Sequence, residues 1–177
     1  MRPLLVALSL AAALQATSGH LDFKAPAGWH TRPPSSTMRV AEFVIPHAAG
    51  DADDAELIVY FFGAQGGGSA QANIDRWIGQ MQEPDGQPAK QAAKTEMRTI
   101  NGLSVSSVDV SGTYVAEMRP GASEHFNKPG YRLIAAVVET PGGQYYIKVT
   151  GPARTVAGAK ADIDKFFASL SYSVSAD

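Results

Sequence analysis

The chain has 177 residues, no cysteine and a formal net charge of -2 at pH 7, and 45% of its residues are hydrophobic. This length and composition fit one globular domain with a sizeable core, and they exclude a disulfide framework and disorder throughout the chain. The nearly balanced charge lacks the basic surface that contact with phosphate backbones requires, so we expect no binding to nucleic acid.

Residues 1–18 have the three parts of a secretory signal peptide. Arg2 provides the positive start, residues 4–14 are apolar except for one serine, and Ala16 and Ser18 are small residues placed for cleavage. A membrane anchor is the alternative, but the apolar run is much shorter than the roughly 20 residues of a spanning helix. We predict cleavage after Ser18, export to the periplasm or the medium, no stable membrane anchor after cleavage, and a single domain over residues 19–177.

The first part of the mature chain reads as two strands. Residues 21–29 alternate apolar and polar residues and predict a short edge strand whose Trp29 turns back onto the core. Residues 30–37 have the prolines and serines of a loop. Residues 38–45 alternate again and predict a second strand, which Pro46 ends.

The connection over residues 46–54 is rich in acids, with Asp51, Asp53 and Asp54, and Glu56 follows it closely. Clustered carboxylates are typical ligands of calcium. Their spacing does not match an EF-hand loop, however, and aspartate is a common turn former. We therefore interpret the segment as a solvated hairpin connection.

A strand, a glycine loop and a helix then follow without a break. Residues 57–62 are almost continuously apolar and predict a central strand covered on both faces. Residues 63–69 form a loop that ends at Ser69, a suitable N-cap. Apolar residues at helical spacing follow, and we expect the helix to pack this face on the sheet: Ala70, Ile74, Trp77, Ile78 and Met81.

Backbone N–H groups at the start of this helix are candidates for contact with an anion or ligand, through Gly66, Gly67, Gly68 and Ser69. The segment lacks the lysine and hydroxyl pattern of a P-loop, and no GxGxxG motif is present. A tight chain reversal at the sheet edge is the favoured interpretation.

Beyond a loop at residues 83–88, two further strands are joined by Asn101-Gly102, the strongest short signal of a β-hairpin. They cover residues 93–100 and 103–114. The valines of the second run do not keep one alternation, so we expect a bulge near Ser106-Ser107.

Residues 115–130 form the longest segment without periodicity, and long loops of this kind tend to be functional or mobile. Its polar residues are candidates for contact with a partner: Glu117, Arg119, Glu124, His125 and Lys128.

The last part of the chain predicts a second hairpin and a final helix. The hairpin pairs residues 131–140 with residues 144–150 across a Pro-Gly-Gly turn. Thr155 is the expected cap of a helix whose apolar face extends to Leu170, and residues 171–177 are expected to fray.

No motif for catalysis or metal binding is recognised. The four histidines are scattered without HxxxH or HExxH spacing, GxSxG is absent, and Ser123-Glu124-His125 places neighbouring loop residues together without forming a triad. We therefore predict no catalytic residue, no metal ligand and no cofactor.

Several segments together resemble small exported bacterial proteins of the Mog1/PsbP-like type: FKAPAGW, AEFVIP, FFGAQGGGSAQANIDRWIGQM, the ING hairpin, GYRLIAAVVET, YYIKVTGPARTV and FFASL. The resemblance implies an α+β fold, an α/β sandwich with a central antiparallel sheet of about six strands packed with helices. Members include a photosystem oxygen-evolving subunit and a Ran-binding import factor. This chain has an export signal in place of a plastid transit peptide and no recognisable Ran-contacting acidic motif, so neither function is carried over.

These observations favour an exported, non-catalytic binding or accessory domain for an unknown protein or small-molecule partner. The alternative is a metal-dependent or hydrolytic enzyme whose site is assembled across loops from His125, Glu117 or Asp53.

Overall fold

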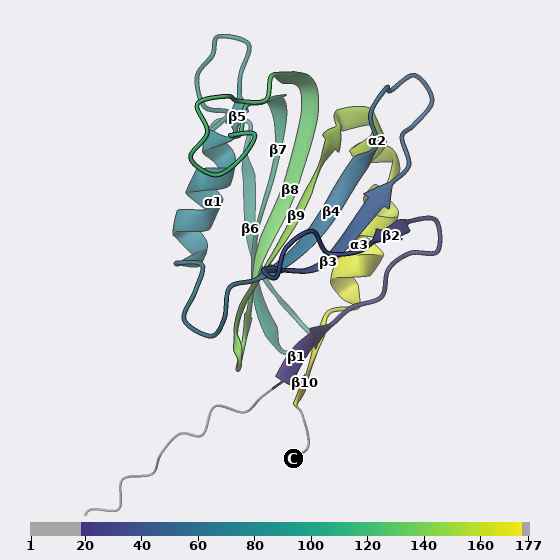
Figure 1. Cartoon of the computed structure of the whole chain (residues 1–177), viewed down its shortest axis with the longest axis vertical. Coiled ribbons are helices and arrows are strands. Elements are labelled where there is room, and N and C mark those ends of the chain that lie inside the picture. Colours follow the sequence, from purple (N-terminus) through teal and green to yellow (C-terminus); the bar gives the residue numbers. More distant parts are fainter. Residues whose placement is uncertain (1–18, 175–177) are drawn as a thin grey trace, which may run out of the picture.

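The computed structural model describes residues 19–174, so the predicted signal peptide and its cleavage site lie outside the described residues. These residues form ten strands and three helices, whose arrangement is drawn in Figure 1. In chain order they are β1 (Gly19–Asp22), β2 (His30–Arg32), β3 (Arg39–Ile45), β4 (Ala55–Phe61), α1 (Ala70–Gly79), β5 (Met81–Gln82), β6 (Lys94–Ile100), β7 (Leu103–Tyr114), β8 (Lys128–Thr140), β9 (Gly143–Pro152), α2 (Ala153–Gly158), α3 (Lys160–Ala168) and β10 (Ser171–Val174).

The main sheet is antiparallel and has eight strands, in the order β2-β3-β4-β9-β8-β7-β5, with β6 also paired to β7. The α+β class is confirmed, but the predicted number of about six strands is too small. Residues 30–32, which were expected in a loop, pair with β3 as a short edge strand. Met81, which was expected on the helix, lies in β5 because α1 already ends at Gly79.

A separate two-stranded ribbon joins the two ends of the described chain. Gly19 pairs with Val174, and Asp22 pairs with Ser171. The predicted edge strand over residues 21–29 is therefore wrong beyond Asp22, and the predicted fraying of residues 171–174 is also wrong. Leu21 and Leu170 are buried in the core, and this anchors both arms of the ribbon. Trp29 does turn back onto the core, where it stacks on Phe166.

One face of the sheet is covered by α2, α3 and the β1–β10 ribbon, and it holds the larger core cluster. The predicted last helix is divided in two at Ala159. Thr155 is not its cap, because it lies inside α2, where it is buried and its hydroxyl donates a hydrogen bond to Asp51 at 2.6 Å. The Asp51 carboxylate also accepts from the Thr155 backbone N–H, so it ties the β3–β4 connection to the start of α2.

The opposite face is covered by α1, whose main contacts are with β5, β7 and β8. Ser69 is its N-cap, as predicted, and accepts a hydrogen bond from the Ala72 N–H at 3.2 Å. Ile74 and Trp77 pack into the second core cluster against β7 and β8, which confirms the predicted apolar face. Figure 1 shows that α1 lies at one side of the sheet, so the β9, β4 and β3 portion of this face is left without a helix over it.

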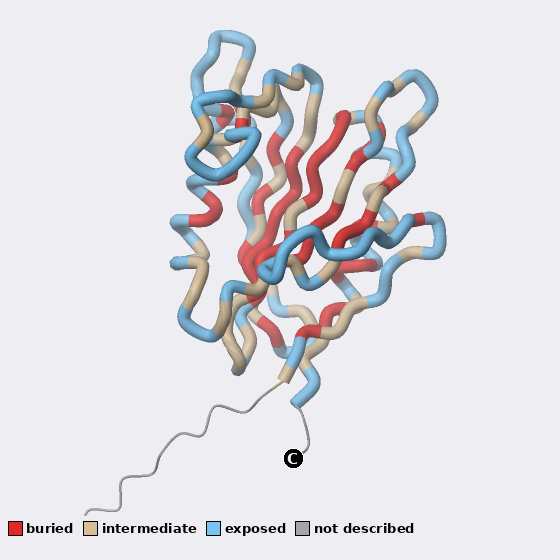
Figure 2. The backbone as a smooth tube through the Cα atoms, viewed as in Figure 1, coloured by how far each residue is buried: buried red, intermediate tan, exposed pale blue. Residues whose placement is uncertain are grey.

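The central strands carry most of the buried residues, whereas β2 and most of β6 are exposed (Figure 2). The bulge predicted near Ser106-Ser107 is wrong, because the β7–β8 ladder runs without a shift from Ser104 to Gly112. Both faces of β7 are covered, so Val105 packs in one cluster and Val108 in the other. The Asn101-Gly102 turn is confirmed, with φ values of 47° and 84°.

Strand β4 is covered on both faces only in part. Leu57 and Val59 are fully buried on the side of α2 and α3. On the other side Ile58 is buried, while Glu56 and Tyr60 are only half-buried. Within residues 19–174, no helix combines the length and the apolar character that crossing a membrane requires.

Candidate functional site

The side chains of β3, β4 and β9 that lie beyond α1 on this side of the sheet form what we call the open face: Glu42, Val44, Glu56, Ile58, Tyr60, Lys148 and Thr150. The ladders place Glu56 opposite both Val44 and Thr150, and Ile58 opposite Lys148. Because directly paired residues point to the same side of a sheet, these side chains share one face.

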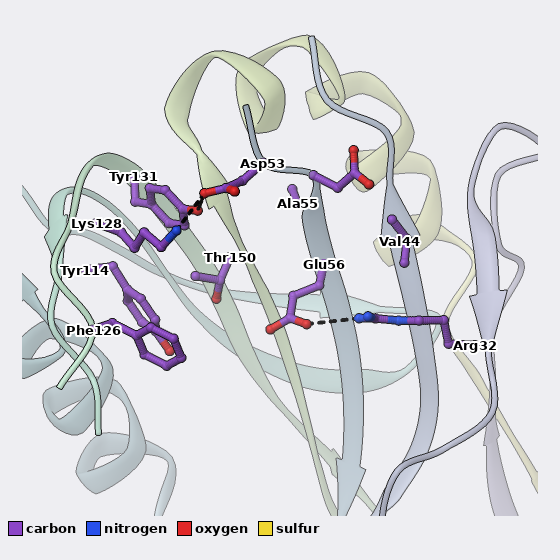
Figure 3. A pocket seen from close by; sticks show the side chains of 11 residues that line it. Arg32, Val44, Asp53, Ala55, Glu56, Tyr114, Phe126, Lys128, Tyr131 and Thr150 are labelled. Carbon is purple, nitrogen blue, oxygen red and sulfur yellow. Dashed lines mark hydrogen bonds and ion pairs between the residues drawn. The ribbon is translucent and has the colours of Figure 1, made fainter. Parts of the chain in front are cut away.

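A cleft of about 350 Å³ lies over one end of the open face (Figure 3). Its lining combines side chains of β2, β3, β4, β7, β8 and β9 with the loops at that end: Arg32, Val44, Asp53, Asp54, Ala55, Glu56, Tyr114, Phe126, Lys128, Tyr131 and Thr150. Aromatic and aliphatic surface with a few polar groups is the usual composition of a ligand site.

Three aromatic rings form one side of the cleft, and we call them the aromatic wall: Tyr114, Phe126 and Tyr131. The ring centroids of Tyr114 and Phe126 are 5.5 Å apart, and those of Tyr114 and Tyr131 are 6.2 Å apart, with interplanar angles of 27° and 12°. The β7–β8 ladder shifts between Gly112 and Tyr114, at the point where this wall begins. The wall therefore gathers residues from β7, β8 and the loop between them.

Two ion pairs line the cleft, one beside the aromatic wall and one across from it. Asp53 accepts hydrogen bonds from the Lys128 Nζ at 2.8 Å and from the Tyr131 hydroxyl at 2.7 Å. Across the cleft, Glu56 pairs with Arg32 at 3.1 Å. Figure 3 shows the two pairs on opposite sides of Thr150. The hydrogen bonds from Lys128 and then Tyr131 lower the pKa of Asp53, so this carboxyl is ionised at neutral pH.

Lys148 lies beside the cleft, at the foot of the aromatic wall. Its Nζ donates to the Gln80 Oε1 at 2.7 Å and to the Tyr114 hydroxyl at 2.9 Å. Burial lowers the pKa of Lys148 to about 8; Glu56 opposes this shift, and Arg76 and Arg39 add to it. The open face thus holds a desolvated amine next to an aromatic surface.

The glycine loop lies away from the cleft lining. Its carbonyl oxygens are held by the protein: the Asn73 Nδ2 donates to the Gly67 oxygen at 2.7 Å, and the Tyr146 hydroxyl lies 3.1 Å from the Gly68 oxygen. The Gly66 N–H already donates to Gly63, and the Ser69 hydroxyl caps α1. Contact of Gly66, Gly67, Gly68 and Ser69 with an anion stays a prediction.

The structure brings together only some of the residues predicted to contact a partner. Lys128 begins β8 and lines the cleft. Glu117 and His125 pair with each other through an isolated bridge, and the His125 Nδ1 donates to the Val115 carbonyl oxygen at 2.8 Å. Arg119 and Glu124 are exposed on the loop. Contact with a partner through this loop stays a prediction.

The alternative is a site assembled across loops from two or more of His125, Glu117 and Asp53. Of these, Asp53 lines the cleft, where it binds Lys128 and Tyr131, whereas Glu117 and His125 are outside the lining. Within residues 19–174, no group of three or more His, Cys, Asp or Glu side chains is arranged to hold a metal ion.

Sequence reasoning missed Lys148 and the aromatic wall. One signal was available for Lys148: it alternates with Tyr146 and Thr150 in the run QYYIKVT, in a strand flanked by apolar residues. A charged residue at a half-buried position of such a strand is unusual.

No family model matches the chain, and no curated protein matches it in sequence. Among solved structures, the chain is similar to LpqN of Mycobacterium tuberculosis, which is described as involved in cell envelope biogenesis. The TM-score is 0.56 at 10% identity, over 90% of this chain and 87% of that one. Cyanobacterial PsbP (CyanoP) from Synechocystis sp. PCC 6803 aligns at a TM-score of 0.45 and 14% identity, over 94% and 98% of the two chains. The likeness to LpqN shows a common fold and, at this identity, nothing about activity.

Proposed function

We propose that this chain, which has the Mog1/PsbP-like fold, is an exported, non-catalytic binding domain that holds its ligand in the cleft over the open face. One observation carries the proposal: α1 does not extend over all of the sheet, and beyond it a cleft has an aromatic wall on one side and the Glu56–Arg32 ion pair on the other. Aromatic side chains that remain accessible in a concave site are typical of recognition surfaces.

The state of the cleft acids supports binding rather than acid–base chemistry. Asp53 and Glu56 each have a cation as partner, at 2.8 Å and 3.1 Å. The pKa of Asp53 is lowered, away from the neutral range in which a general acid or base works best. Fixed charges of this kind orient a ligand without exchanging protons with it.

The uncharged aromatic compound 2-naphthamide is a suitable probe of the cleft, because its fused rings can stack on the aromatic wall. Ligand-observed NMR should show saturable binding to the mature protein. The Phe126→Ala variant should weaken this binding by about tenfold. The loss of one stacked ring accounts for about 1 kcal/mol, and the loss of buried apolar area accounts for the rest. Phe62→Ala is the matched control, because Phe62 is an exposed ring outside the cleft lining. Absence of saturable binding, or an equal loss in both variants, would contradict the proposal.

Export has its own test. The protein isolated from its native host should begin at Gly19, because residues 1–18 carry the charge, the apolar run and the small residues of a cleavable signal. N-terminal sequencing of the envelope and medium fractions measures this directly. An intact Met1 on the isolated protein would contradict export by this route.

A further inference from the structure

We propose that Lys148 binds the carboxylate of an amphipathic ligand whose aromatic or apolar body lies against the aromatic wall. This inference rests on the proposed use of the cleft and names the class of ligand. It is carried by three observations on the open face: the position of Lys148, the pairing of the surrounding charges, and the state of its three N–H donors.

The strand register gives the position. Ile147 and Val149 are fully buried in the core on the far side of the sheet, so Lys148 between them points to the open face. Its ladder partners are apolar, Ile58 on β4 and Ala135 on β8. Its hydrogen bond to the Tyr114 hydroxyl joins the amine to the base of the aromatic wall. An aromatic ligand on the wall would therefore have a cation at one end.

Lys148 has no carboxylate partner among the surrounding charges of residues 19–174. Each acid that lines the cleft already has a cationic or histidine partner: Asp53 with Lys128, Asp54 with His47, and Glu56 with Arg32. Within residues 19–174, the side-chain partners of the Lys148 Nζ are the neutral oxygens of Gln80 and Tyr114. A buried charge is stabilised mainly by an opposite charge, so this site favours an anion.

The donor count leaves one N–H of Lys148 without an acceptor among residues 19–174. A lysine ammonium has three N–H donors, and Gln80 and Tyr114 accept two of them. The third is available to a carboxylate oxygen, and hydrogen bonds between ions are stronger than those between neutral groups. The neighbouring Glu56 carboxylate disfavours a doubly charged group such as a phosphate monoester, so the geometry favours a monoanion.

The test compares 2-naphthoate with 2-naphthamide, which have the same ring system and differ in charge. At pH 7 the protein should bind the carboxylate about tenfold more tightly than the amide, since one charge-assisted hydrogen bond supplies at least that factor. In Lys148→Met the affinities for the two probes should come to within about twofold of each other, while the affinity for 2-naphthamide stays unchanged. Lys148→Gln should have the same effect. Lys90→Met is the matched control, because Lys90 is exposed and outside the cleft lining, and should keep the preference.

The pH dependence of the preference for the carboxylate probe is a second measurement. It would not change with the protonation of a lysine that has only a structural role. The preference for the carboxylate should decline as pH rises through the pKa of Lys148, about 8 in the free protein, because the neutral amine no longer attracts an anion. Equal binding of both probes, or a preference that persists in Lys148→Met, would overturn this inference and leave the cleft as a binding site. Binding of neither probe would overturn the proposed function as well.

Discussion

Replacing Lys148 with methionine is expected to raise the free energy of unfolding at pH 7 by about 1–3 kcal/mol. The ammonium is desolvated, its Nζ lies 4.9 Å from the ring centroid of Tyr114, and its direct partners are uncharged. Methionine has a similar length and makes no demand for a counter-ion. The difference between the ordinary pKa of 10.5 and about 8 corresponds to roughly 3 kcal/mol, which is an upper bound on the gain.

The gain in the free energy of unfolding from Lys148→Met should become smaller as the pH rises. Between about pH 8 and 10.5 the unfolded chain keeps the proton on Lys148 and the folded protein loses it, so folding becomes more favourable as pH rises. The advantage of Lys148→Met over the original protein should therefore shrink from pH 7 to pH 10. Urea denaturation at both pH values measures this, with Lys90→Met expected to stay within about 0.5 kcal/mol of the original protein. A less stable Lys148→Met at pH 7 would show that the hydrogen bonds to Gln80 and Tyr114 outweigh desolvation.

The Gly67→Ala variant is expected to lower the free energy of unfolding by about 2–4 kcal/mol. Gly67 has a φ of +90°, which a residue with a Cβ rarely adopts. A Cβ at this position would also lie 2.2 Å from the Tyr146 hydroxyl oxygen. Tyr146 is buried in the second core cluster, so its ring cannot move aside without opening a cavity.

Gly28→Ala is the matched control for Gly67→Ala. Gly28 lies in an exposed turn, its φ is not positive, and an added Cβ would meet no heavy atom within 4 Å. This variant should remain within about 1 kcal/mol of the original protein, or gain slightly through the less flexible unfolded chain. Chemical denaturation of the three proteins measures both effects. A Gly67→Ala protein as stable as Gly28→Ala would mean that the loop can take another path around Tyr146.

Local signals explain why much of the fold was predictable. Asn101-Gly102 identified its hairpin because a tight turn needs two residues with positive φ. Ser69 marked the start of α1 because its hydroxyl accepts from the Ala72 N–H only three residues on. The strands without such signals were missed: His30–Arg32 is exposed and becomes β2 only by pairing with β3. Pairing between distant segments likewise turns Ser171–Val174 into β10.

The candidate site depends almost entirely on contacts between distant parts of the chain. Asp53 and Lys128 are 75 residues apart in sequence, and Lys148 and Gln80 are 68 apart. The sequence indicates Lys128 through its place in a long polar segment, but Lys128 lines the cleft because β8 begins there. Strand order decides which acids find a cationic partner and that Lys148 has none of opposite charge, and no local pattern of residues encodes strand order.

The β1–β10 ribbon places Gly19 and Val174 side by side, at the opposite end of the molecule from the β3–β4 connection and the start of β8 (Figure 1). Facing residues of an antiparallel pair are separated by about the span of a two-residue turn. A short peptide linking the two would therefore close the ribbon into a hairpin, and new ends could be opened at Gly86, which is exposed and outside the cleft lining. Such a circular permutant would keep the cleft intact, and a surface-immobilised protein held by the ribbon would present the cleft outward to solution.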